Sequence, residues 1–264
     1  MATTKRVPAP EEADKLIAHQ ARLLKAPRIA ALSAEAEQGR ASNWSLEDYL
    51  GAVLAVESNT RAESGAHQRI RYAGFPAINT ITDFDFAAQP AADRVKDRPP
   101  GRRGWLSDAR NIVLLGPPGT GKTHLATALA IAAAHAGHRV AFAPATGWIT
   151  RIAEAHRIDR LDDELRKISR FGLIVMDEVG YIPVDTEAAD LLFQLVSTRY
   201  EKSSIILTSN PPFSRWGQVF GEATIASAMI DRIVHHADVI ALKGASYRIK
   251  HTAIESLPSV ETSC

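Results

Sequence analysis

Cysteine is nearly absent from this chain of 264 residues, because the single cysteine is Cys264, the last residue. One cysteine excludes an internal disulfide and a metal site built from cysteines, which fits a reducing compartment. No apolar run approaches the roughly 18 residues that are needed to span a bilayer. The N-terminal sequence MATTKRVPAPEEADK also lacks the apolar segment of a secretory signal peptide. We therefore expect a cytoplasmic protein.

The chain also lacks an excess of charge of either sign, since its formal net charge at pH 7 is +1. A global basic signal for nucleic acid is therefore missing, and any such binding must come from a local patch. Hydrophobic residues at 45% and charged residues at 23% are ordinary for a soluble globular protein. The length suits one α/β domain with a small accessory piece.

The sequence divides into four parts. Residues 1–70 read as an all-helical N-terminal domain that binds DNA or a partner, with Pro27 interrupting one helix and Gly39 ending the next. Within it, Ser45-Leu46-Glu47-Asp48 resembles an N-cap box, and apolar residues at helical spacing predict a helix over 45–68. Residues 71–110 read as a connector, residues 111–250 as the main domain, and residues 251–264 as a C-terminal tail.

The main domain alternates short apolar runs with helical segments. The runs are NIVLL, RVAFA, FGLIVMD, SIILTS and DVIAL, and THLATALAIAAAHAG follows the first of them as a helix with Gly137 as its stop. Fully apolar runs are typical of strands that are buried on both faces. The pattern predicts an α/β fold, with a parallel sheet, right-handed crossovers and helices on both faces.

A phosphate-binding loop is predicted at GPPGTGKTHLA, residues 116–126, which fits G-x-x-x-x-G-K-[ST] between a predicted strand and a predicted helix. Glycines let successive backbone N–H groups point at phosphates, and the helix N-terminus adds its positive end. Lys122 would bridge the β- and γ-phosphates, and the Thr123 hydroxyl would hold Mg²⁺. We predict that ATP is bound by the loop residues Gly116, Pro117, Pro118, Gly119, Thr120, Gly121, Lys122, Thr123 and His124.

Acidic and polar side chains end two further predicted strands. LIVMDEVG delivers Asp177 to the carboxyl end of its strand, where it suits an indirect hold on Mg²⁺, and Glu178 can reach a water in line with the γ-phosphate. An acid directly after the aspartate favours hydrolysis over transfer to a small acceptor. SSIILTSN ends in Thr208, Ser209 and Asn210, where a polar side chain could position that water or sense the γ-phosphate.

Arg232 lies on a predicted helix, residues 224–236, just before the last strand. It is either a surface residue in a salt bridge or an arginine finger that enters the site of a neighbouring subunit, and the residues alone leave both readings open. An arginine finger typically raises the rate of phosphoryl transfer by roughly 10³- to 10⁵-fold. His235 and His236 have no other ligand candidate at metal spacing in the sequence, which favours a structural or surface role.

Together these segments resemble the IstB-type transposition helper ATPases of the AAA+ class, relatives of the DnaC-type helicase loaders. The likeness rests on GPPGTGKTHLA, LIVMDEVGYIP, IILTSN, and AMIDRIVHHADVI followed by GASYR, and it extends upstream through RIRYAGFPAINTITDFDF. It covers most of the chain from about Ile70 to Lys250. Only about 20 residues follow the last predicted strand, which is too few for the usual C-terminal AAA+ lid and suits this branch of the class.

The resemblance implies a bacterial ATPase of a transposable element, such as an insertion sequence. It would form a homo-oligomer with shared ATP sites on double-stranded DNA and assist a partner transposase in transposition. By motif match, Lys122 and Thr123 would bind phosphate and Mg²⁺, and Asp177 would help to hold the metal. Glu178 would activate the attacking water. Asn210 falls at the first sensor and Arg232 at the arginine finger. The same likeness places Phe84 or Phe86 near the adenine.

DNA contacts are expected to rest on phosphates, with little sequence specificity. The basic residues of the connector are the first candidates: Arg94, Lys96, Arg98, Arg102 and Arg103 lie close together in the sequence. The charge count alone favours a solvated loop, and the resemblance is what points to DNA.

Three other functions stay open at this stage. One is a DnaC-like replicative helicase loader with the same core, and another is a monomeric P-loop kinase for a small metabolite. The third is a nucleotide-gated binding module without useful turnover, which Glu178 argues against.

Overall fold

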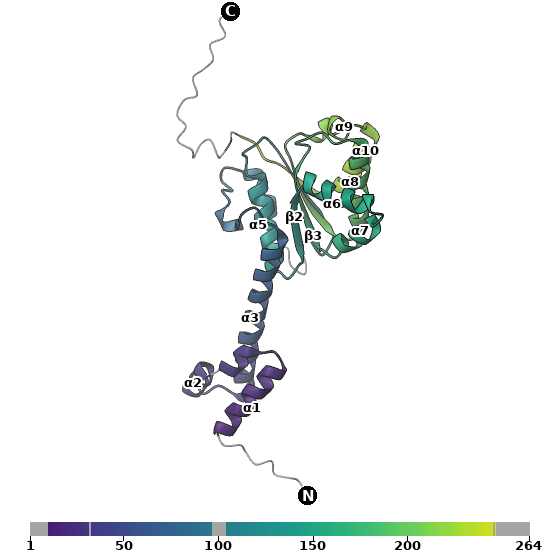
Figure 1. Ribbon diagram of the computed structural model, residues 1–264. Helices are drawn as coiled ribbons and strands as arrows, with labels where there is room; N and C mark the ends of the chain where they lie inside the picture. The colour runs from purple at the N-terminus through teal and green to yellow at the C-terminus, as the bar shows by residue number, and fades with distance from the viewer. Residues whose placement is uncertain (1–9, 32, 97–103, 245, 247–264) are drawn as a thin grey trace, which may run out of the picture. The chain divides into compact units, whose positions relative to one another are not determined.

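The computed structural model describes residues 10–31, 33–96, 104–244 and 246. Its contacts divide the chain into two compact units, Met1–His67 and Gln68–Cys264. The first unit contains helices and turns, whereas the second contains the sheet (Figure 1).

The described part of the first unit is helical. Its elements are α1 (Pro10–Leu23), the 3-10 helix η1 (Pro27–Ala31), α2 (Ser33–Ala41) and the beginning of α3 (Leu46–Ala73). Gly39 lies inside α2, so the expectation that Gly39 ends this helix is wrong. The chain leaves the helix only where Asn43, with a φ of 51°, turns it toward α3. Helix α3 also continues past residue 68, where the sequence prediction had ended it.

The start of α3 carries the capping box that its sequence predicts. The Asp48 N–H donates to Ser45 Oγ at 3.0 Å, and the Ser45 N–H donates back to Asp48 Oδ2 at 3.4 Å. These bonds satisfy backbone donors that the first turn of a helix otherwise leaves unpaired. The local sequence therefore sets where this helix begins.

A buried carboxylate joins α3 to the end of α1. Glu57 is only 7% exposed, and it accepts hydrogen bonds from the Arg61 side chain at 2.7 Å and from the Arg28 N–H at 3.0 Å. Arg61 also donates to the carbonyls of Leu24 and Lys25, the residues that follow α1. Those carbonyls belong to the unsatisfied C-terminal end of a helix, which favours a cation. The Glu57–Arg61 pair therefore closes this small unit.

The second unit is built on a five-stranded sheet in the order β2-β3-β4-β1-β5, and every neighbouring pair is parallel. The strands are β1 (Asn111–Leu115), β2 (Val140–Pro144), β3 (Leu173–Val179), β4 (Ser204–Ser209) and β5 (Ala237–Ala241). The predicted parallel sheet is thus confirmed. The central strands β1, β3 and β4 are buried along nearly their whole length, which explains their unbroken apolar sequences.

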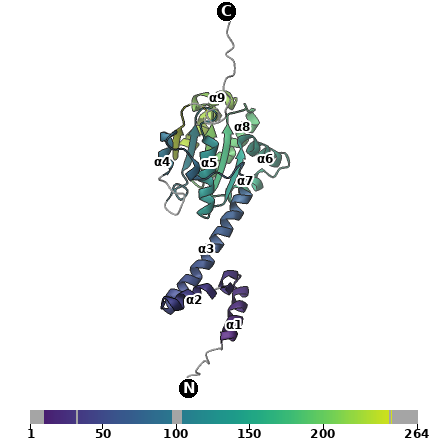
Figure 2. The same cartoon turned by 90° about the vertical axis from the view of Figure 1, so that its left-hand side faces the viewer.

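Helices cover both faces of this sheet, as predicted (Figure 1). On one face lies α5 (Lys122–His135), which packs with residues of the connector and is turned toward the viewer in Figure 2. The other face carries α6 (Ala145–Arg157), α7 (Leu161–Ser169), α8 (Thr186–Arg199) and α10 (Ala223–Val234). The remaining short elements are η2 (Ile81–Asp83), η3 (Pro90–Ala92), α4 (Asp93–Lys96), η4 (Phe213–Arg215) and α9 (Trp216–Val219).

Asn111, the first residue of β1, connects three elements through its buried side chain. Its Nδ2 donates to the Ile233 carbonyl on α10, and its Oδ1 accepts from the Ile205 N–H on β4, both at 2.9 Å. The Asn111 N–H donates to the His236 carbonyl at 2.7 Å. One amide side chain therefore satisfies backbone groups of a helix end and of a strand start.

Arg199 is a buried cation at the end of α8, with 1% of its surface exposed. Its guanidinium donates to the carbonyls of Ile168, Phe171 and Ser204 at 2.9–3.2 Å. Burial lowers the pKa of Arg199 to about 10, so the side chain remains protonated at neutral pH. The residue joins the end of α7 to the beginning of β4.

We predict that Arg199→Leu destabilises the fold by about 3 kcal/mol or more, because three buried carbonyls lose their donor. For a unit of this size the melting temperature should fall by roughly 6–12 °C, measured by thermal unfolding of the full chain. Arg170→Ala, which removes an exposed arginine, is the matched control and should leave the melting temperature nearly unchanged. Equal melting temperatures for the two variants would contradict this role of Arg199.

Candidate nucleotide site

Glycine is required at two places in the loop between β1 and α5. Gly121 precedes α5 with a φ of +91°, a left-handed conformation that glycine adopts without strain. A Cβ at Gly116 would lie 2.3 Å from the Leu242 carbonyl oxygen, so only glycine fits beside that strand end. The loop thus delivers the N-terminus of α5 to the carboxyl end of the sheet, which is a favourable place for phosphate.

The charged ammonium group of Lys122 is buried inside this loop. The residue is 6% exposed, and its Nζ donates to the carbonyls of Gly116 and Pro117, both at 2.7 Å. The Thr120 hydroxyl closes the same turn by donating to the Pro117 carbonyl at 2.9 Å. A buried ammonium that is surrounded by backbone groups is well placed to exchange those carbonyls for phosphate oxygens.

Two oxygen donors suited to Mg²⁺ meet beside the loop. The Thr123 hydroxyl lies 3.0 Å from Asp177 Oδ1 and 3.1 Å from Oδ2. Hydroxyl and carboxylate oxygens are groups that Mg²⁺ prefers, so Thr123 and Asp177 are the residues that would hold the ion.

Thr208 joins β3 to β4 at this point. Its hydroxyl donates to Asp177 Oδ1 and accepts the Glu178 N–H at 2.9 Å. The register of β3 against β4 is interrupted between Met176 and Val179, and Glu178 takes a φ of 60°. Irregularities of this kind redirect a side chain at the end of a strand. Here the exposed Glu178 side chain lines a pocket.

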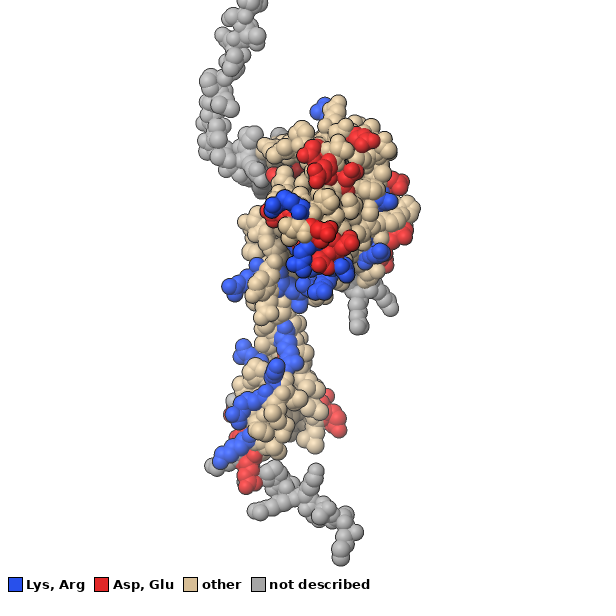
Figure 3. All heavy atoms as spheres, turned by 45° about the vertical axis from the view of Figure 1, so that its right-hand side comes forward, with Lys and Arg blue, Asp and Glu red and all other residues tan. Residues whose placement is uncertain are grey.

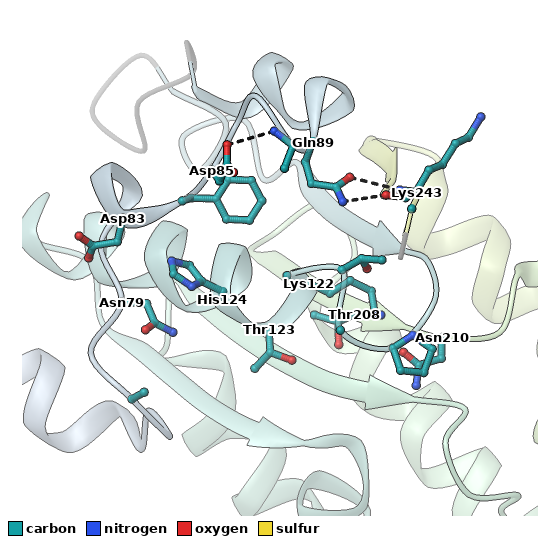
Figure 4. A pocket seen from close by; sticks show the side chains of 18 of the residues that line it. Asn79, Asp83, Asp85, Gln89, Lys122, Thr123, His124, Thr208, Asn210 and Lys243 are labelled. Atoms are coloured by element: carbon teal, nitrogen blue, oxygen red, sulfur yellow. Dashed lines mark hydrogen bonds between the residues drawn. The ribbon is translucent and has the colours of Figure 1, made fainter. Parts of the chain in front are cut away.

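The pocket has a volume of about 470 Å³ and opens above the phosphate-binding loop (Figure 4). Its walls come from four segments of the chain that lie far apart in the sequence. These segments are the connector, the loop with the start of α5, the ends of β3 and β4, and the residues after β5. The lining residues include Asn79, Asp83, Phe84, Asp85, Gln89, Pro118, Gly119, Thr120, Gly121, Lys122, Thr123, His124, Glu178, Thr208, Asn210, Lys243 and Gly244.

The connector forms one wall of this pocket. Phe84 is 8% exposed and packs with its ring centroid 5.6 Å from that of His124 and 4.9 Å from that of Phe86. Phe84 lines the pocket, and Phe86 packs against the ring of Phe84. The Thr80 hydroxyl and N–H lower the pKa of Asp83, with a smaller contribution from His124, so Asp83 places a negative charge on this wall.

Two hydrogen bonds join the connector to the segment after β5. The Gln89 side chain donates to the Lys243 carbonyl at 2.8 Å and accepts the Lys243 N–H at 3.2 Å, which Figure 4 shows as two dashed lines. The Gln89 amide thus makes to the Lys243 backbone the same pair of hydrogen bonds that a neighbouring strand would make. These two bonds join the wall formed by the connector to the wall formed by the residues after β5.

Most of the predicted site residues come together here. The loop residues from Pro118 to His124, Glu178 and Asn210 line the pocket, while Asp177 lies beneath it against Thr123. Arg232 is elsewhere: it donates to Ser197 Oγ at 2.6 Å and lies 4.2 Å from the ring centroid of Phe193 on α8.

The candidate DNA residues fall largely beyond the described part of the chain. Arg94 and Lys96 belong to the short helix α4, while Arg98, Arg102 and Arg103 lie outside the described residues.

The sequence prediction missed Asp83, Gln89 and Lys243 as pocket residues. Thr80-Ile81-Thr82-Asp83 has the capping spacing that the structure uses around η2, so this signal was present in the sequence. The Gln89–Lys243 pair carries no local signal, because its partners meet only through the fold.

The family described as IstB-like ATP binding protein matches residues 19–254 of this chain. The chain belongs to the IstB-like ATP-binding family. The match includes the phosphate-binding loop, both acidic residues of β3, Asn210 and Arg232, so the family resemblance predicted from the motifs is confirmed.

Relatives in the IstB-like family come from insertion sequences. An ATP-binding protein of the insertion sequence IS21 from Pseudomonas aeruginosa is 41% identical over 214 residues, which is 81% of each chain. An IS5376 counterpart from Geobacillus stearothermophilus is 34% identical, over 84% of this chain and 89% of the relative.

Two solved structures share the fold of this chain over about two thirds of its length. DnaI matches with a TM-score of 0.54 and 17% identity, over 67% of this chain and 94% of its own. DnaA from Aquifex aeolicus, solved with AMPPCP bound, matches with a TM-score of 0.52 and 20% identity, over 64% of this chain and 51% of its own. At these identities the likeness concerns the fold alone. In the described part of the chain, no helix is long and apolar enough to cross a membrane.

We predict that Lys122→Ala weakens ATP binding by roughly 1.5–3 kcal/mol, because a charge-assisted contact to phosphate is lost. This corresponds to an increase in Kd of about 10- to 150-fold, measured by titration of a fluorescent nucleotide. Lys202→Ala, at an exposed lysine, should leave the Kd unchanged. Affinity for AMP, which lacks the β- and γ-phosphates, should change far less than affinity for ATP. An equal loss for both nucleotides would contradict the assignment of Lys122 to these phosphates.

Proposed function

We propose that this chain is a Mg²⁺-dependent ATPase that assembles as an oligomer on double-stranded DNA and assists a transposase in DNA transposition. ATP binding changes its grip on DNA, and hydrolysis to ADP and phosphate resets the assembly. Membership of the IstB-like family supports the ATP site itself. Hydrolysis, DNA binding and the partner are argued below from the residues.

The main support for ATP hydrolysis is that Glu178 and Lys122 line the same pocket. Lys122 and the N-terminus of α5 would hold the β- and γ-phosphates in place. Glu178 would accept a proton from the water that attacks the γ-phosphorus, while the bond from that phosphorus to the bridging oxygen breaks. Asn210, the residue directly after β4, would orient the same water. Mg²⁺ at Thr123 and Asp177 would neutralise the negative charge of the phosphates.

DNA binding is supported by basic side chains on the N-terminal unit. On the face drawn in Figure 3, Lys and Arg side chains form a line along this unit. Among the described residues of this unit, the exposed basic ones are Lys15, Arg22, Lys25, Arg28, Arg40 and Arg61. The connector residues Arg94, Lys96, Arg98, Arg102 and Arg103 stay part of the proposal. Contacts of this kind engage phosphates without reading sequence, and an oligomer would multiply them along a duplex.

The transposase is the proposed partner because the relatives above belong to insertion sequences. A helicase loader with the same core is the nearest alternative. The two functions differ in the partner protein, so co-purification of the full chain with the transposase or with the replicative helicase separates them.

Arg232 is proposed to complete the ATP site of a neighbouring subunit. It lies outside the pocket wall of its own chain and on the last turn of α10. One subunit would contribute Lys122, Asp177 and Glu178, and the next would contribute Arg232. The bonds that Arg232 makes to α8 would then belong to the unassembled chain.

We predict that Glu178→Gln lowers the ATPase rate by about 10² to 10⁴, the usual contribution of a general base, while ATP still binds. Binding to a long DNA duplex should then persist in ATP instead of decaying with turnover. The measurements are phosphate release and duplex binding by anisotropy. Glu187→Gln, at an exposed glutamate on α8, should leave both unchanged. An unchanged ATPase rate in Glu178→Gln would contradict the proposed role of Glu178. Duplex binding that does not depend on ATP would contradict the proposal that ATP controls DNA binding.

A mixing experiment tests the shared site. Arg232→Ala and Lys122→Ala should each lose the ATPase activity measured on duplex DNA, by at least about 10³ for the arginine finger. Mixing the two inactive variants should restore part of the activity, because some interfaces pair an intact Lys122 with an intact Arg232. Activity that stays absent in every mixture, or a rate per wild-type subunit that is independent of protein concentration, would contradict sites shared between subunits.

A further inference from the structure

A cluster of three ligand-type side chains lies away from the nucleotide pocket. His235 and His236 follow α10, and Glu201 follows α8, so the fold brings together residues from two separate turns. His236 Nε2 lies 3.5 Å from Glu201 Oε1, and His235 Nδ1 lies 3.9 Å from the same oxygen. One ligand atom from each of the three residues lies within 4.8 Å of the others. We propose that these residues bind a transition-metal ion of the Zn²⁺ class.

The spacing of the three atoms suits such an ion. Zn²⁺ binds imidazole nitrogen and carboxylate oxygen at about 2.0–2.2 Å in tetrahedral geometry, which places neighbouring ligand atoms about 3.4 Å apart. The two distances to the Glu201 oxygen are close to this value. Each of the three side chains is about half exposed, at 48–54%, so small side-chain rotations can close the remaining gap. Two histidines and a glutamate form a common Zn²⁺ ligand set that leaves a position open for water.

The surroundings of the cluster favour a cation. His235 occupies the C-cap of α10, where the negative end of the helix dipole lies. The Tyr200 hydroxyl lies 2.8 Å from His235 Nδ1 and adds a second oxygen beside the site.

The Glu201 backbone also fits this role. Glu201 has a φ of 57°, which is uncommon for a residue other than glycine, asparagine or aspartate. This conformation belongs to the tight turn between α8 and β4, and it directs the carboxylate at the histidine pair. A bound ion would therefore join the turn after α8 to the turn after α10. The sequence spacing could not reveal the third ligand, because Glu201 meets the histidines only in the folded chain.

Titration of the metal-free full chain with Zn²⁺ tests this proposal. The protein carries no affinity tag, is stripped with a chelator, and is measured by isothermal titration calorimetry without nucleotide. We expect one Zn²⁺ per chain. His236→Ala and Glu201→Gln should each lower the affinity by at least about tenfold. Zn²⁺ should raise the melting temperature of the wild-type chain and raise it less in both variants.

His67→Ala is the matched control, since His67 is an exposed histidine in the other unit of the chain, and it should bind Zn²⁺ like the wild type. Failure of the wild-type chain to bind Zn²⁺ would overturn the proposal. So would equal binding by His236→Ala, Glu201→Gln and the wild type, because the ion would then occupy a different site. The readout is metal binding alone, so neither result depends on ATPase activity or on DNA.

Discussion

Strand β4 lies between β1 and β3, and the site depends on this pairing. Leu115 of β1 pairs with Ser209, which in turn pairs with Val179 of β3. The Gly116 N–H extends the ladder by donating to the Ser209 carbonyl at 3.2 Å. The phosphate-binding loop and the acidic strand therefore end at the same edge, although they are not neighbours. A slip of β4 by one residue would turn Thr208 to the other face and separate it from Asp177.

The sequence predicted the parts of the site that local chemistry determines. Glycines with a lysine and a threonine between a strand and a helix define the loop, and an apolar run ending in Asp177 and Glu178 defines the acidic strand. The capping box at Ser45 was predictable for the same reason, because its two partners are three residues apart. Gly39 was misread, since the packing and hydrogen bonding of a helix can outweigh the unfavourable propensity of one residue. Contacts such as Gln89–Lys243 and Glu201–His236 depend on strand order, which periodicity does not encode.

Arg232 has a partner within its own chain, and this matters if neighbouring subunits share ATP sites as proposed. Its hydrogen bond to Ser197 and its stacking on Phe193 hold the guanidinium against α8. Leaving them costs on the order of 1–2 kcal/mol. The charge of a γ-phosphate in the adjacent subunit offers a stronger contact. The side chain would therefore move only when a neighbour contains the triphosphate, which couples assembly to the nucleotide.

The side chain of Asn111 limits how such a movement can occur. Because it bonds to Ile233 on α10 and to Ile205 on β4 at once, α10 cannot slide along its axis without breaking a buried hydrogen bond at the base of the sheet. Helix sliding is therefore a costly way to deliver Arg232. What remains is a change of rotamer at Arg232 itself, or a rotation of the whole sheet-containing unit as a rigid body. Within one subunit, the distance that the guanidinium can move is therefore set by the length of a single side chain.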